Sequence, residues 1–272
     1  VGSEYERKSK NLFSEFAGVT YSWGNVALYA NMALGQSASH SKISESDYGQ
    51  NITINSMSES TDKSLYYRPK LGFDFYISPK HYLGVEWSGN YSKDYANACW
   101  VHSTITDNSP YQTSIRSYAP YTLKPNTNNV TLNYEWKTDT LGSKLNLIAD
   151  YVGEREHDLY EYENKYTQGI GGDSIISKSQ SSFEYVNICS AQVDFTKFFN
   201  RHQFTLGTKY INANIHYDNK LYLGNTTLGG MLSKDVDQWD DFCYVERRYA
   251  IYGMYRYSSR PWDFQVGLRD EY

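Results

Sequence analysis

Residues 130–151, VTLNYEWKTDTLGSKLNLIADY, hold the pattern that decides the fold. Apolar and polar side chains alternate on both sides of a short polar turn, with the apolar positions at Val130, Leu132, Tyr134, Trp136, Leu145, Leu147, Ala149 and Tyr151. Successive side chains of a β-strand point to opposite faces, so each half predicts a strand with one apolar face. A helix would need apolar residues three and four positions apart, and this stretch lacks that spacing.

Hairpins of this kind recur five times along the chain. Their short turns lie at 23–25, 78–80, 139–143, 199–201 and 258–260, with centres about 55 to 62 residues apart. A constant spacing indicates one architecture built from a repeated unit. The flanking segments predict ten strands: 11–23, 25–39, 59–77, 81–95, 128–138, 144–155, 181–197, 202–216, 241–257 and 261–272.

The segments between the hairpins, 40–58, 96–127, 156–180 and 217–240, are expected to be long polar loops. Proline and glycine tend to break strands, and these segments contain Pro110, Pro120, Pro125, Gly169, Gly171, Gly172, Gly224, Gly229 and Gly230. Short turns at one end and long loops at the other are typical of a membrane β-barrel.

The composition is compatible with such a barrel and argues against other classes. No run of 18 apolar residues occurs, which excludes a transmembrane helix. The 28 Tyr, 11 Phe and 6 Trp suit strands and the membrane–water boundary. The net charge of −5 argues against nucleic acid as a partner.

Each expected strand reaches the roughly 9–11 residues that a tilted strand needs to cross the apolar layer. The prediction is an all-β antiparallel meander of about ten long strands. It forms part of a transmembrane β-barrel, as one unit over residues 1–272, with short periplasmic turns and long extracellular loops. A soluble β-sandwich or a small ten-stranded enzyme barrel is the less favoured alternative.

The alternation assigns side chains to the two faces of the sheet. Polar residues on one parity are candidates for the barrel lumen: Asp74, Glu86, Glu135, Lys137, Asp150, Asp194, Lys209, Arg269 and Glu271. Apolar and aromatic residues on the other parity are expected to face lipid or to form an aromatic girdle beside the turns: Trp23, Phe73, Phe75, Trp136, Leu145, Leu147, Tyr257, Trp262 and Phe264.

The chain shows no signature of catalysis, of a cofactor or of a metal site. The six His residues do not show the spacing of metal ligands and are expected to be solvated. The charged run 154–158 is expected to form the solvent-exposed base of a loop. Asp240 and Asp241 lack the regular spacing of a calcium loop. Cys189 and Cys243, on apolar parities, are expected to act as small apolar side chains. We expect that the chain is not an enzyme.

Four segments in order resemble the outer-membrane barrel proteins of Bacteroidota that are related to TonB-dependent receptors. They lie at 71–85, 129–151, 191–210 and 242–272, and the resemblance covers about residues 60–272. It implies a larger barrel of about 22 strands with a plug domain before it in the sequence. Here no plug sequence or TonB box is identified, so the chain is expected to be a fragment of that barrel.

The resemblance implies nutrient uptake across the outer membrane of a Gram-negative bacterium. The expected partners are outer-membrane lipid and, in the complete protein, a plug domain, a TonB-type energiser and a surface lipoprotein. The alternative is a non-transporting barrel that acts as a surface anchor or as a structural member of an envelope complex.

Overall fold

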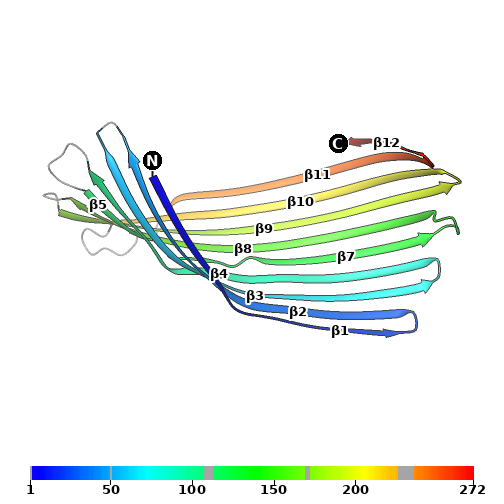
Figure 1. Ribbon diagram of the computed structural model, residues 1–272, viewed down its shortest axis with the longest axis horizontal. Coiled ribbons are helices and arrows are strands. Elements are labelled where there is room, and N and C mark those ends of the chain that lie inside the picture. The colour runs from blue at the N-terminus through cyan, green and yellow to red at the C-terminus, as the bar shows by residue number, and fades with distance from the viewer. Residues whose placement is uncertain (1, 50, 107–112, 169–171, 226–235) are drawn as a thin grey trace.

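The computed structural model describes residues 2–49, 51–106, 113–168, 172–225 and 236–272. They form one antiparallel sheet (Figure 1). Its twelve strands are β1 (Gly2–Trp23), β2 (Val26–Tyr48), β3 (Thr53–Ser78), β4 (His81–Thr106), β5 (Thr113–Tyr118), β6 (Tyr121–Leu123), β7 (Asn126–Lys137), β8 (Lys144–Gln168), β9 (Gly172–Phe199), β10 (His202–Asn225), β11 (Val236–Ser259) and β12 (Trp262–Glu271). Within these residues, no helix is long and apolar enough to cross a membrane.

The strands follow one another across the sheet in chain order, which is a meander. β5, β6 and β7 lie end to end between β4 and β8, so the twelve strands fill ten positions. Pro120 and Pro125 stand at the two interruptions, since proline has no N–H to donate to a neighbouring strand. The ten expected strands and the breaks at these prolines are confirmed, while Pro110 lies outside the described residues.

The long polar loops are the main error of the sequence analysis. Most of 40–58, 96–127, 156–180 and 217–240 is strand, and Gly172 and Gly224 lie within strands; Gly169, Gly171, Gly229 and Gly230 lie outside the described residues. Cross-strand pairs of polar side chains continue the sheet here, as in Ser41–Ser60 and Ser56–Ser103, both with Oγ atoms 2.9 Å apart. Where both faces of a sheet meet water, the apolar alternation disappears although the pairing continues.

The five short turns are confirmed, and all lie at the right-hand end of the sheet in Figure 1. Asp139 holds the longest of them, because its Oδ1 accepts hydrogen bonds from the backbone N–H of Leu141 (2.9 Å) and of Ser143 (3.0 Å). Gly24 and Asn200 have φ angles of 56° and 53°, which glycine and asparagine tolerate best.

The sheet is a single curved layer, as Figure 1 shows. Its accessible surface is 18178 Å², whereas a compact protein of 31.5 kDa exposes about 12,000 Å². The buried hydrophobic residues among those described are only Ala96, Ala213 and Ala250. The apolar face is therefore not packed against a second sheet or a helix of the described chain.

Candidate functional site: the two faces of the sheet

The pairing register sorts the candidate residues onto two opposite faces. Directly paired residues point to the same side of a sheet, and the row Gly72, Glu86, Thr131, Asp150 and Ser190 crosses five positions in register. By the same pairing, all nine residues expected in the lumen share this face, which we call the polar face. All nine residues expected in lipid share the other, the outer face. That these faces meet lumen and lipid stays a prediction.

The carboxylates of the polar face are held by neighbouring donors. Glu86 accepts from Tyr29 (2.7 Å) and lies 2.8 Å from Lys70 Nζ. Glu135 forms an ion pair with Lys144 at 2.8 Å, with Lys137 further away at 3.9 Å.

Charged side chains on the later strands of the polar face also have neighbouring partners. Asp150 accepts from Thr131 (3.0 Å) and from Ser190 (3.1 Å). Arg269 pairs with Glu271 on β12, and Lys209 lies in register between Gln192 and Ala250. The polar face thus carries fixed charges of both signs whose positions are set by hydrogen bonds.

A three-strand arrangement recurs on the polar face, and we call it a tyrosine bridge. A tyrosine, a glycine and a polar side chain lie in register on adjacent strands, and the tyrosine ring crosses the glycine so that its hydroxyl forms a hydrogen bond with that side chain. In one bridge Tyr252 passes over Gly207 and donates to Asp194. The other two are Tyr29–Gly72–Glu86 and Tyr66–Gly35–Ser14.

Each bridge depends on the missing side chain of its glycine. A Cβ atom at Gly207 would collide with the ring of Tyr252, and one at Gly72 would collide with that of Tyr29. Sequence analysis missed the bridges because the glycine and its tyrosine are far apart in the chain. Their only sequence signal is a glycine on the polar parity of a strand.

Aromatic side chains form two rows on the outer face. The expected row lies beside the turns, where Trp23 and Trp262 are both 75% exposed. A second row was not predicted: Trp87, Tyr151, Tyr210 and Tyr249 are the seventh, eighth, ninth and eleventh residues counted from the turn ends of β4, β8, β10 and β11. This spacing is close to the roughly 9–11 residues that cross the apolar layer, so the two rows bound an apolar band of the expected height.

Beyond the second row, the polar face carries an acidic cluster. Glu154, Glu156 and Asp158 alternate along β8, and Glu184 of β9 lies directly opposite Glu156. Partial burial, together with the nearby charge of Asp158, raises the pKa of Glu156 to about 7. The expectation of a loop base at 154–158 was wrong, because the run is strand.

Three tyrosines continue the polar face next to the acidic cluster. The rings of Tyr121 and Tyr160 lie 6.1 Å apart, and those of Tyr160 and Tyr162 lie 6.3 Å apart. Tyr121 donates a 3.0 Å hydrogen bond to Asp62. We call Glu154, Glu156, Asp158, Glu184 and these three tyrosines the upper polar patch.

Sequence comparison assigns this sheet to a known group of proteins. The model of the Outer membrane protein beta-barrel family matches residues 136–272, which is 137 of the 272 residues. The chain belongs to this family. It is accordingly an outer-membrane protein of Gram-negative bacteria, and its sheet is barrel wall. No curated protein sequence matches the chain.

Solved structures give a weaker likeness, of fold alone. The ferric citrate transporter FecA is 10% identical with a TM-score of 0.34, and the match covers 97% of this chain and 41% of that one. The ferric yersiniabactin uptake receptor FyuA from Yersinia pestis is 8% identical with a TM-score of 0.34, with coverages of 96% and 46%. The translocator domain of the autotransporter NalP from Neisseria meningitidis is 10% identical with a TM-score of 0.19, with coverages of 100% and 87%. The chain spans less than half the length of the two receptors.

Proposed function

We propose that the chain forms part of the wall of a TonB-dependent-receptor-like barrel that takes up a nutrient across the outer membrane. The observation that carries this proposal is the polar face, where charges of both signs are held in place by hydrogen bonds. A hydrated interior of this kind can dock a plug and guide a solute. The wall is a passive scaffold, and energy comes from an inner-membrane partner.

The upper polar patch supports uptake over a purely structural role. It lies beyond the apolar band, on the side of the sheet away from the short turns. Tyrosine rings stack on sugar rings and on peptide side chains at little entropic cost, and the adjacent carboxylates accept hydrogen bonds from hydroxyl or amino groups. We propose a sugar or a peptide as the ligand class.

The proposal includes the partners and the source that the resemblance implies. The remaining strands and a plug belong to the complete protein, a TonB-type protein supplies energy, and a surface lipoprotein assists capture. The source is a bacterium of the Bacteroidota. We propose further that the chain is not an enzyme. Two of its histidines, His81 and His202, each form a 2.8 Å hydrogen bond with a tyrosine hydroxyl beside a turn, which places them in the aromatic girdle.

The test uses the intact protein in detergent. We expect it to bind the periplasmic domain of the TonB protein from the same bacterium, and we expect gene deletion to impair growth on a sugar or peptide source that also requires TonB. Failure to bind that domain, together with unchanged growth, contradicts uptake. Retention of a surface lipoprotein during purification would then support the anchor instead.

A further inference from the structure

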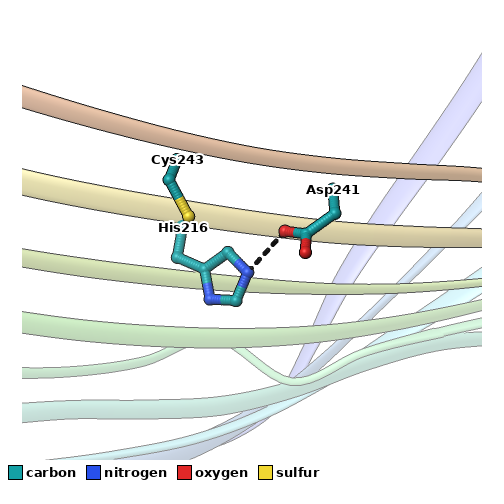
Figure 2. Close-up of side chains that lie close together, drawn as sticks. All are labelled: His216, Asp241 and Cys243. Carbon is teal, nitrogen blue, oxygen red and sulfur yellow. Dashed lines mark hydrogen bonds and ion pairs between the residues drawn. The ribbon is translucent and has the colours of Figure 1, made fainter.

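Three side chains of metal-ligand type meet on the outer face of β10 and β11. Figure 2 shows His216, Asp241 and Cys243 side by side. One ligand atom from each lies within 4.8 Å of the other two, and His216 Nε2 is 2.7 Å from Asp241 Oδ1. His216 and Cys243 are directly paired, and Asp241 precedes Cys243 by two residues on the same face. Backbone pairing therefore holds the three together.

The distances suit a small tetrahedral ion. Zinc binds nitrogen and oxygen at about 2.0–2.2 Å and sulfur at about 2.3 Å, so neighbouring ligand atoms in a tetrahedral site lie about 3.3–3.7 Å apart. The present separations, from 2.7 Å to within 4.8 Å, bracket these values.

The donor set selects the class of ion. A thiolate, an imidazole and one carboxylate oxygen suit zinc and related divalent transition ions, whereas calcium and magnesium prefer oxygen ligands alone. Asp218, which pairs with Asp241 across the strands, is already held by Lys220 Nζ (2.8 Å) and by Trp239 Nε1 (2.7 Å). Asp241 is therefore the carboxylate available to the site, and water completes the fourth position.

The cluster lies beyond the apolar band, on the part of the strands that is expected to extend into water. His216 is the fifteenth residue of β10, beyond both Tyr210 of the second aromatic row and the roughly 9–11 residues that cross the apolar layer. The side chains of His216 and Asp241 are 45% and 50% exposed, so an ion can reach them from solution.

We propose that His216, Asp241 and Cys243 form a surface site for Zn²⁺ or a similar divalent transition ion. On binding, the Cys243 thiol loses its proton to water, and the ion replaces the hydrogen bond between His216 and Asp241. The bound ion ties β10 to β11 above the membrane. The proposal departs from the expectations of a solvated His216 and of Cys243 as a small apolar side chain. Sequence analysis missed the site because only the strand register brings His216 to Cys243.

The intact protein, reduced and in detergent, is titrated with Co²⁺ as a spectroscopic probe. We expect a thiolate-to-cobalt absorption band in the near ultraviolet, one ion per chain, and loss of the band when Zn²⁺ is added. Cys243→Ser should abolish the band, and Asp241→Asn and His216→Ala should each weaken Co²⁺ binding at least about tenfold. Cys189→Ser and His202→Ala are the matched controls and should bind as the wild type does.

Alkylation gives a second measurement that needs no variant. Zn²⁺ should slow the alkylation of Cys243 but not that of Cys189, which is also exposed on the outer face. A missing band with Co²⁺ in excess, a band that survives in Cys243→Ser, or equal alkylation of both thiols with and without Zn²⁺ would overturn the proposal. None of these results bears on uptake, so the two proposals can fail separately.

Discussion

At the scale of single residues, glycine does more for this sheet than its frequency suggests. In a single layer, side chains cannot gain stability by packing into a core, so they pack along the face of the sheet. Gly207 leaves the space across which Tyr252 reaches Asp194. The bridge covers the exposed glycine backbone with a ring and gives the carboxylate a donor.

Gly207→Ala is expected to destabilise the protein by about 1–3 kcal/mol, because the added methyl group displaces Tyr252 and removes the hydrogen bond that its hydroxyl donates to Asp194 Oδ1, leaving Gln192 as the donor to Oδ2. Unfolding in detergent by denaturant measures the change. Gly253→Ala on the neighbouring strand is the control, since a Cβ there has nothing closer than 4.0 Å. In a Tyr252→Phe background the cost of Gly207→Ala should shrink. An undiminished cost would show that the glycine acts through its backbone rather than through the bridge.

At the scale of elements, most strands are about twice as long as a membrane requires, and the sequence analysis predicted the part of each strand nearest the turn but missed much of the far end. Alternation marks a strand only where its two faces meet different surroundings, as in Leu145 to Tyr151 against Asn146 to Asp150. Further along β8, both faces meet water, and charged residues occupy both parities. In that part of β8, the turn fixes which residues pair, and the strands continue the same register outward. The local sequence pattern does not reveal this pairing. For the same reason, the sequence analysis did not predict that His216 lies beside Cys243.

The outward half of β8 has a measurable pH dependence. An unfolded Glu156 has the ordinary glutamate pKa of 4.5, whereas in the folded protein its pKa is raised to about 7. Between these values the folded chain holds a proton that the unfolded chain has released, so the free energy of unfolding falls as pH rises through this window. Because Glu156 is only partly buried, solvent screening limits the effect to about 1 kcal/mol.

Glu156→Gln removes the ionisation and should flatten the stability profile between pH 5 and pH 7, with a gain over wild type at pH 8. Thermal unfolding of the detergent-solubilised protein across this range is the measurement. Glu161→Gln, on the exposed side of the same strand, should leave the slope unchanged. Parallel profiles for wild type and Glu156→Gln would contradict the assignment.

At the scale of the whole molecule, the meander of ten strand positions and the five turns were predicted from the sequence and are confirmed. The predicted lumen and lipid residues divide between two faces of the sheet, and which face meets lipid stays a prediction. The sequence could not predict the second aromatic row, because Trp87, Tyr151, Tyr210 and Tyr249 align only once the register is known. Because the chain belongs to a family of outer-membrane barrels, we predict that lipid covers the outer face. That assignment can be tested by depth along one strand.

Leu147 and Leu159 lie on the outer face of β8, one within the apolar band and one beyond it. Leu147→Arg is expected to cost about 2–4 kcal/mol of folding in the membrane, because it places a charge near the middle of the band, whereas Leu159→Arg should cost about 0–1 kcal/mol. Asn146→Arg, next to Leu147 but on the polar face, should also be mild. The measurement is the folded fraction of each of the three variants in outer membranes, determined from the change in gel mobility on heating. Because the two leucines share strand, face and substitution, only their depth differs, and equal effects at both would show that the outer face does not meet hydrocarbon.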